Sequence, residues 1–195
     1  MKKGGGRTDG GRDARLFLSI LFFIFLALFP KYSPFDYRGD GEGIVYHIFQ
    51  LYFFVAEQTL GIVHEGGHGV CYILPCPEPL MVANGTIFQI LFPLGIAWYY
   101  KRRGEMFYAL IALFFTGFSL YYTAWYISTA YKGPIVPANE SFLGVDGYHD
   151  FYYLLNRMGL LAYYGFISAF VKFLSFCIMI VSVAGMLLQS IGGKE

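Results

Sequence analysis

Two histidines and a glutamate lie close together in an apolar stretch of the chain, in the order His64-Glu65-Gly66-Gly67-His68. In a helix of 3.6 residues per turn, His64 and His68 lie about 40° apart on one face, so both imidazoles can reach one metal ion. This HExxH pattern is typical of zinc sites in which the glutamate is the general base. The alternative is two histidines hydrogen-bonded across a helix bundle, with Glu65 as their partner. The cost of placing charge in a membrane favours the metal site.

A catalytic zinc needs a third protein ligand and an open position. One other histidine, His149, has carboxylates near it in the sequence, Asp146 and Asp150. We therefore predict that the third ligand is Asp146, His149 or Asp150. Neighbours on a helix point about 100° apart, so His149 and Asp150 are not expected to share one metal ion, and one of them would orient a ligand instead. The alternative is capping alone, with Asp146 as N-cap and Asp150 in the first helical turn.

Three further polar residues inside apolar segments are weaker candidates. Asn84 and Gln89 are predicted either to hydrogen-bond a substrate or to join helices. Glu57 lies two helical turns before His64 on nearly the same face, which suggests a proton relay or a partner for a metal ligand.

The three cysteines, Cys71, Cys76 and Cys177, match no zinc-ribbon spacing. The favoured interpretation of each is a small apolar side chain in a membrane bundle. Cys71 and Cys76 are expected to form a local disulfide only if the loop after Leu74 faces an oxidising compartment.

Composition indicates the environment of these residues. The 195-residue chain is 56% hydrophobic and 14% charged, whereas soluble domains carry about 25% charged residues. This excludes a soluble globular protein and a disordered chain. The net charge of +1 also excludes a broad basic surface for nucleic acid. The sequence therefore predicts an integral, multi-pass membrane protein.

The pattern predicts an all-α fold: a disordered basic arm over residues 1–15, then a single transmembrane helical domain over 16–195. About five hydrophobic helical segments are expected around a buried zinc site, because a backbone in lipid must satisfy its own hydrogen bonds. Strands are not expected, and residues 75–85 are predicted to form a loop or re-entrant turn. One segment is expected to be kinked or re-entrant at Pro93. The segments are 16–30, 44–74, 79–100, 106–131 and 158–190.

Membrane orientation does not follow from the charge pattern. If every segment crosses once, seven basic residues lie on one face and six on the other. The basic arm favours a cytoplasmic N-terminus, and the first segment is expected to be a retained anchor.

At residues 45–160 the chain resembles the site-2 protease class of intramembrane zinc metalloproteases. The resemblance rests on HEGGH in a helix, followed two crossings later by Asp146-Gly147. It implies that His64 and His68 bind zinc, that Glu65 is the general base and that Asp146 is the third ligand. The proline spacing before Asp146 departs from the class pattern, and no PDZ-like domain is present. The chain is also similar to small prokaryotic membrane proteins with the same HEGGH, which implies His149 or Asp150 in place of Asp146, and a prokaryotic cell membrane.

These features predict a zinc metallopeptidase, with Zn²⁺ as cofactor and Glu65 acting on a zinc-bound water. The expected partners are membrane lipid and a membrane-protein or peptide substrate, without nucleic acid. Two alternatives use the same residues. One is a zinc-dependent membrane hydrolase of a lipid amide or ester, and the other is a non-catalytic membrane protein that binds metal or haem.

Overall fold

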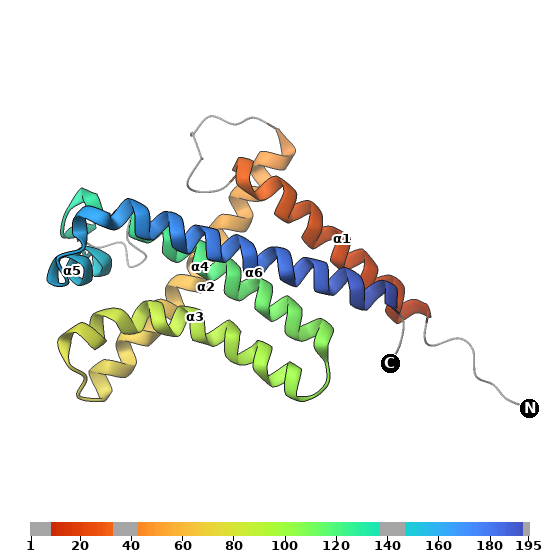
Figure 1. The fold of residues 1–195 in the computed structure, drawn as a ribbon, viewed down its shortest axis with the longest axis horizontal. Coiled ribbons are helices and arrows are strands. Elements are labelled where there is room, and N and C mark those ends of the chain that lie inside the picture. The colour runs from red at the N-terminus through yellow and green to blue at the C-terminus, as the bar shows by residue number, and fades with distance from the viewer. Residues whose placement is uncertain (1–8, 33–42, 137–146, 193–195) are drawn as a thin grey trace, which may run out of the picture.

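The protein is an all-α bundle with very little sheet (Figure 1). The computed structural model describes residues 9–32, 43–136 and 147–192. The helices are α1 (Asp9–Tyr32), α2 (Ile44–Ile73), α3 (Glu78–Arg102), α4 (Met106–Ser128), α5 (Asp150–Arg157) and α6 (Tyr164–Gly192). Two 3-10 turns, η1 (Ala130–Lys132) and η3 (Leu161–Tyr163), and two short strands, β1 (Ile135–Val136) and β2 (Gly147–Tyr148), complete the order.

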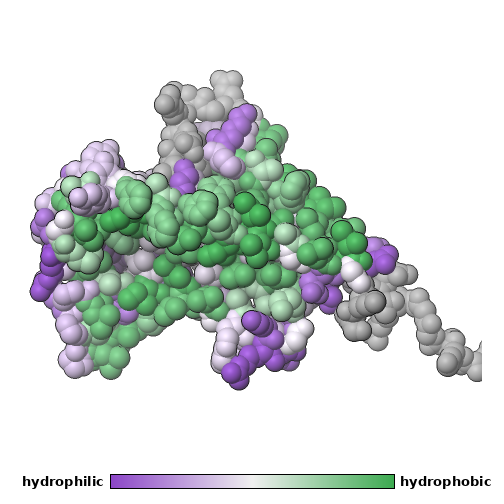
Figure 2. Space-filling model, viewed as in Figure 1, coloured by the Kyte–Doolittle hydropathy of each residue, from purple (hydrophilic) through white to green (hydrophobic). Residues whose placement is uncertain are grey.

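Four helical stretches in the described residues are long and apolar enough to cross a membrane, namely Gly11–Tyr32, Glu78–Arg102, Met106–Lys132 and Leu161–Gly192. Figure 2 shows apolar side chains over the middle of the bundle and hydrophilic ones mainly toward its ends. A surface of this kind suits lipid, because each helix satisfies its own backbone hydrogen bonds. The prediction of an all-α membrane protein is confirmed. Helix α2 is not among the four stretches, and it is the helix that carries the HExxH pattern.

Helix α4 forms the centre of the bundle. Its rings Phe114 and Tyr121 are almost completely buried, and the ring centroid of Phe29 from α1 lies 4.5 Å from that of Tyr121. Gly117 lets α6 approach closely, because a Cβ there would lie 2.8 Å from Cγ of Met179. Small residues at such contacts let two helix backbones pack tightly in a membrane. The core therefore joins α1, α4 and α6, and Phe49 of α2 belongs to the same cluster.

Two boundaries differ from the expectation. Helix α3 begins at Glu78, so the loop expected to reach residue 85 ends much earlier. Proline is tolerated in the first turn of a helix, where its missing N–H has no partner to lose, and Pro79 therefore does not delay the start. Helix α3 has no break at Pro93, so the re-entrant alternative is not formed there, whereas a kink is compatible with a continuous helix. Helix α1 already includes residues 9–15, which the sequence assigns to the disordered arm.

The expectation that the chain has no strands is wrong at one point. Strands β1 and β2 pair antiparallel, with Ile135 opposite Tyr148. The backbone N–H of His149 then donates to the carbonyl oxygen of Pro134 at 2.9 Å. This pairing ties the start of α5 to the end of α4, because β1 follows α4 within a few residues.

The first and last helices show how the ends of the bundle are arranged. Ser19, near the start of α1, lies with its Oγ 3.0 Å from Oγ of Ser190, near the end of α6. Arg15 of α1 also lies over the ring of Phe107, at the start of α4. An arrangement in which five segments each cross once would put these helix ends on opposite faces. The structure instead places them at the same end of the bundle (Figure 1).

Candidate metal centre

The HExxH pattern lies in the last third of α2, as one face of a continuous helix. The Nε2 atoms of His64 and His68 are 3.2 Å apart. His64 is buried, with 5% of its surface exposed, and His68 is partly buried. The two imidazoles therefore converge on one point, as a spacing of four residues allows.

Asp150 joins the two histidines from another part of the chain. Its Oδ2 lies 2.9 Å from Nε2 of His64 and 3.4 Å from Nε2 of His68. It is the first residue of α5, and its backbone N–H donates to the hydroxyl oxygen of Tyr126 at 3.2 Å. An ionised carboxylate has only acceptor sites, so Asp150 presents lone pairs toward both imidazoles.

The spacing of these three atoms fits a tetrahedral zinc. Nitrogen and oxygen ligands bind zinc at about 2.0–2.1 Å, which puts two ligand atoms of a tetrahedron about 3.4 Å apart. The three separations here, 2.9, 3.2 and 3.4 Å, are near that value. His64, His68 and Asp150 could thus hold a metal ion and leave one position open.

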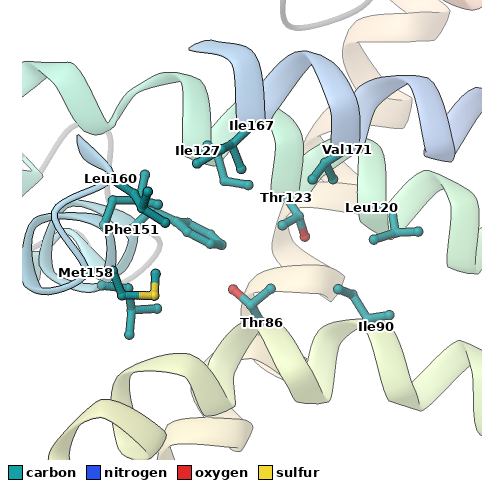
Figure 3. Close-up of a pocket in the computed structure, with 12 residues that line it drawn as sticks. Thr86, Ile90, Leu120, Thr123, Ile127, Phe151, Met158, Leu160, Ile167 and Val171 are labelled. Carbon is teal, nitrogen blue, oxygen red and sulfur yellow. The ribbon is translucent and has the colours of Figure 1, made fainter. Parts of the chain in front are cut away.

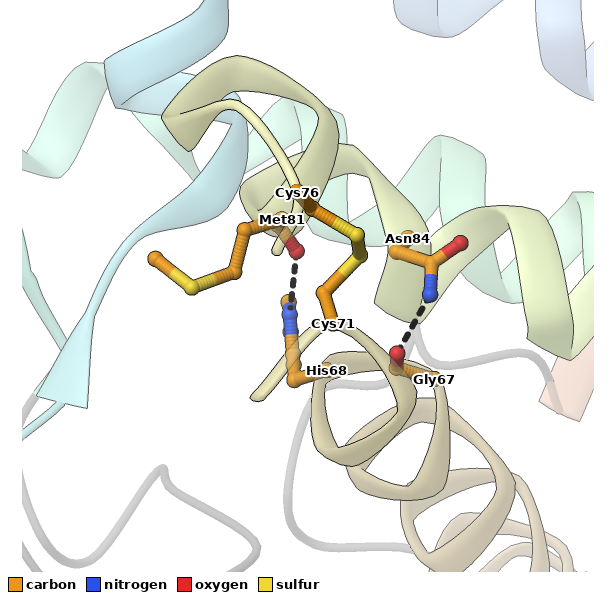
Figure 4. The surroundings of a disulfide bond; sticks show 6 residues. All are labelled: Gly67, His68, Cys71, Cys76, Met81 and Asn84. Carbon is orange, nitrogen blue, oxygen red and sulfur yellow. Dashed lines mark hydrogen bonds between the residues drawn. A yellow bond between two sulfur atoms is a disulfide. The ribbon is translucent and has the colours of Figure 1, made fainter. Parts of the chain in front are cut away.

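The outer nitrogen of each histidine has a fixed acceptor. Nδ1 of His68 lies 2.8 Å from the carbonyl oxygen of Met81, so this nitrogen must donate (Figure 4). Nδ1 of His64 lies 3.2 Å from Oε1 of Gln89. Gln89 in turn donates from Nε2 to the carbonyl oxygen of Ser119, which leaves its own oxygen to accept from His64. When neutral, both histidines therefore carry their single proton on Nδ1.

This assignment leaves three acceptors facing one another. With the proton on Nδ1, the Nε2 atoms of His64 and His68 present lone pairs, and the Asp150 carboxylate presents another. Buried acceptors need a donor or a cation, and a ligating histidine generally donates its second nitrogen to a carbonyl or a carboxylate in this way. The donor set is therefore suited to a cation bound between the three residues.

Gly85 of α3 makes room for this convergence. A Cβ at this position would lie 2.5 Å from Nε2 of His68 and 2.7 Å from Nε2 of His64. Only glycine lets the α3 backbone lie this close to both nitrogens. The contact places α3 as one wall of the centre, and the sequence alone did not identify this glycine.

Glu65 lies next to the cluster without belonging to it. Its side chain is partly exposed, and within the described residues it makes no hydrogen bond. It interacts electrostatically with His68 and with Tyr126. Within the described part of the chain, no hydrogen bond competes with proton exchange between this carboxylate and a molecule that enters beside the histidines.

The weaker candidates separate into two groups. Gln89 contacts the centre through His64. Asn84 donates instead to the carbonyl oxygen of Gly67 and joins α3 to α2. Glu57 interacts with the phenol of Tyr122 on α4 rather than with a histidine.

His149 caps α5 and is turned away from the centre. Its Nδ1 accepts from the backbone N–H of Tyr152, and its Nε2 lies 3.0 Å from Oγ1 of Thr129. Burial lowers the pKa of His149 to about 4, so the ring is neutral at pH 7. Because Tyr152 and Thr129 already contact its two ring nitrogens, the ring has no free nitrogen for a metal. The N-cap of α5 is thus His149 and not Asp146, which lies outside the described residues.

Tyr126 is a site residue that sequence reasoning missed. Its ring stacks on that of His149, with centroids 4.3 Å apart, and its hydroxyl accepts from the Asp150 backbone. Only its place in the last turn of α4 pointed to it, among many other tyrosines. It connects the α4 end to the residue that completes the cluster.

An apolar cavity of about 390 Å³ lies beside the centre, between α3, α4, α5 and α6 (Figure 3). Its lining includes Thr86, Ile127 and Phe151. These three residues directly follow Gly85, Tyr126 and Asp150, so their Cα atoms are about 3.8 Å from those of the site residues. None of the residues that line it belongs to the His64, His68 and Asp150 cluster, so the cavity is a separate apolar space near the centre.

Cys71 and Cys76 form a disulfide between the last turn of α2 and the start of α3 (Figure 4). The favoured interpretation of these two cysteines as separate apolar side chains is therefore wrong. The alternative, a local disulfide, is what the structure has. Cys177 is free.

Fold and cluster together define a class: an all-α membrane protein with a candidate centre of two histidines and one carboxylate. No protein-family model, no curated protein and no solved structure matches this chain. Its function is therefore inferred from its own residues.

Proposed function

We propose that this protein is an intramembrane zinc metalloprotease that hydrolyses a peptide bond at or within the bilayer. His64, His68 and Asp150 would hold the zinc. The observation that supports the proposal is the convergence of their three acceptor atoms within 3.4 Å of one another, with both histidine protons directed outward. The resemblance of the HEGGH segment to the site-2 protease class supports the choice of a peptide substrate.

Zinc bound by such residues polarises a carbonyl group and lowers the pKa of bound water to about 7. Glu65 is the group that takes a proton from the attacking water and returns it to the leaving amine. Its position next to His64, without a competing hydrogen bond in the described residues, suits that exchange. Gln89 and Met81 keep the two imidazoles oriented throughout.

The apolar cavity supports a membrane-embedded substrate, because an apolar side chain can be accommodated next to the site. The proposed partners are accordingly membrane lipid and a membrane-protein or peptide substrate. Nucleic acid is not a proposed partner. Similarity to small prokaryotic membrane proteins supports a place in a prokaryotic cell membrane.

The first test measures metal and cleavage together. Purified protein in proteoliposomes should contain near-stoichiometric zinc by elemental analysis and should cleave at least one of a panel of transmembrane peptides, as detected by mass spectrometry. Glu65→Gln should retain the zinc and lose cleavage by about 10²–10⁴-fold. Glu57→Gln on the same helix is the matched control and should keep both.

Other outcomes would contradict the proposal in distinct ways. Iron in place of zinc would point to a different chemistry of two histidines and a carboxylate. Release of products from lipid amides or esters, with no peptide cleaved, would identify a lipid hydrolase. Bound metal with no effect of Glu65→Gln on any reaction would leave a non-catalytic metal-binding protein.

A further inference from the structure

The Cys71–Cys76 disulfide lies next to the candidate metal centre. Cys71 follows His68 by one turn of α2, and Cys76 lies just before α3, the helix of Met81. Met81 supplies the carbonyl oxygen that holds Nδ1 of His68 (Figure 4). The disulfide therefore closes the turn that joins a proposed metal ligand to the residue that orients it.

This end of the bundle also includes the end of α4 and the start of α6. The ring centroid of His64 lies 6.0 Å from that of Tyr126, near the end of α4. Nε2 of His64 lies 2.9 Å from Oδ2 of Asp150, at the start of α5. Glu78 at the start of α3 pairs with Arg157 at the end of α5 at 3.4 Å. We call this the disulfide end. The opposite end holds the start of α1, the turn between α3 and α4, and the end of α6.

Basic residues are distributed unevenly between these two ends. Among the described residues, the opposite end carries five: Arg12, Arg15, Lys101, Arg102 and Arg103. The disulfide end carries three in the same part of the chain: Lys31, Lys132 and Arg157. An excess of lysine and arginine marks the cytoplasmic side of a membrane protein. The excess follows from the packing of α1 against α6 and α4, which puts the start of α1 on the same side as the turn between α3 and α4.

Disulfide chemistry points the same way by an independent route. Disulfides persist in oxidising compartments outside the cytoplasm and are rare inside it. The one disulfide among the described residues lies at the end with fewer basic residues. Two observations of different physical origin thus assign the same side.

We propose that the candidate metal centre opens on the non-cytoplasmic side of the membrane, where the Cys71–Cys76 disulfide stabilises the His68–Met81 contact. The orientation does not depend on the proposed function. The substrate class rests on the proposed function. That class is a membrane protein or peptide whose scissile bond lies at the outer boundary of the bilayer. Reduction of the disulfide releases the turn and weakens metal binding.

Orientation is tested by labelling whole cells with a membrane-impermeant maleimide, in full-length protein carrying Cys177→Ser. Tyr131→Cys places an exposed thiol at the disulfide end, and Glu105→Cys places one in the turn between α3 and α4. Tyr131→Cys should be labelled in intact cells, and Glu105→Cys only after permeabilisation. Labelling of Glu105→Cys in intact cells, or failure to label Tyr131→Cys there, would overturn the orientation.

The role of the disulfide is tested by thiol counting and zinc affinity. Denatured wild-type protein should show one reactive thiol before reduction and three after it. Cys71→Ser/Cys76→Ser should bind zinc about tenfold or more weakly in a chelator competition, whereas Cys177→Ser should bind as wild type. Three thiols before reduction, or unchanged affinity in the double variant, would contradict this role. None of these readouts uses proteolysis, so they remain valid if the proposed function fails.

Discussion

At His64 and His68, the chemistry depends on which ring nitrogen carries the proton. A histidine in water exchanges its proton between both nitrogens, but a fixed acceptor at Nδ1 leaves the lone pair on Nε2. Met81 and Gln89 provide those acceptors from α3, at 2.8 and 3.2 Å. The two side chains are thereby oriented as ligands of the proposed metal ion would need to be.

Gln89→Leu removes the acceptor of His64 Nδ1 while keeping an apolar side chain of similar size. We expect zinc affinity to fall by about 10–100-fold, because a ligand that lacks its outer partner is less well oriented. Competition with a chelator of known affinity measures the change. Gln58→Leu, an exposed glutamine on α2, is the control and should leave affinity unchanged. Equal affinity in the two variants would show that Gln89 does not orient the ligand.

Among the elements, helix α5 illustrates how a short segment places a functional residue. Its first residue is Asp150, and the preceding residue, His149, caps the helix by accepting from the backbone N–H of Tyr152. The β1–β2 pairing and the bond from His149 N–H to Pro134 anchor the start of α5 to α4. The position of Asp150 in the cluster therefore depends on the cap of α5 and on the β1–β2 pairing as well as on the contacts of its own side chain.

The cap should give stability a dependence on pH. His149 has a pKa of about 4 in the folded protein and about 6.5 when unfolded, so only the unfolded chain gains this proton between those values. Its stabilising contribution is complete above about pH 6.5, and about 3 kcal/mol is lost as the pH falls toward 4. Denaturant titrations in detergent at several pH values measure the loss.

His149→Asn keeps a capping oxygen but does not titrate. The variant should therefore lack this part of the pH dependence, while the contribution of the other histidines remains in both proteins. Parallel stability curves for wild type and variant between pH 4 and 6.5 would contradict the assigned pKa.

Gly85 tests the contact between α2 and α3. A methyl group in Gly85→Ala would meet both Nε2 atoms at 2.5–2.7 Å, so α3 must move or the imidazoles must turn. We expect zinc affinity to fall by about 100-fold or more, as the ligand geometry is lost. Gly66→Ala on α2 meets no atom within 4 Å and should bind zinc normally, with a gain of up to about 1 kcal/mol in stability. Normal zinc binding by Gly85→Ala would show that the centre is not built against α3.

At the scale of the molecule, the aromatic core and the metal centre occupy different regions of the bundle. Phe29 and Phe114 lie in the cluster that joins α1, α4 and α6 with the first half of α2, whereas the candidate ligands lie in the last third of α2 and at the start of α5. The stability of the bundle and the integrity of the site should therefore respond to different substitutions.

Phe29→Ala removes a ring with no exposed surface from this core. We expect a loss of about 3 kcal/mol or more in stability, because the bundle cannot fill the space completely. Zinc stoichiometry at a temperature where the variant is folded should remain that of wild type. Phe23→Ala, at a position of α1 that is 55% exposed, is the control and should change stability little. A thermal unfolding midpoint equal to wild type for Phe29→Ala would contradict the packing of α1.

Local patterns were enough to predict most helices. Apolar runs and charged boundaries placed α2 and α4 within a few residues, because a helix in lipid must be long and continuous. Two local features were misjudged. Pro79 was expected to keep the chain irregular but lies inside the first turn of α3, and the short β1–β2 pair has too few residues to show a period of two.

The membrane class and the facing pair His64 and His68 could be predicted from composition and spacing, because both depend on residues close together in one helix. The partner of that pair could not. His64 and Asp150 are 86 positions apart, and the sequence offered Asp146, His149 and Asp150 on equal terms. Folding distinguishes His149 from Asp150 through the start of α5: one turns inward to cap the helix, and the other turns toward the histidines. The sequence also could not show which helix ends lie on the same side of the membrane. That arrangement follows from the contact of α1 with α6, which are far apart in the sequence.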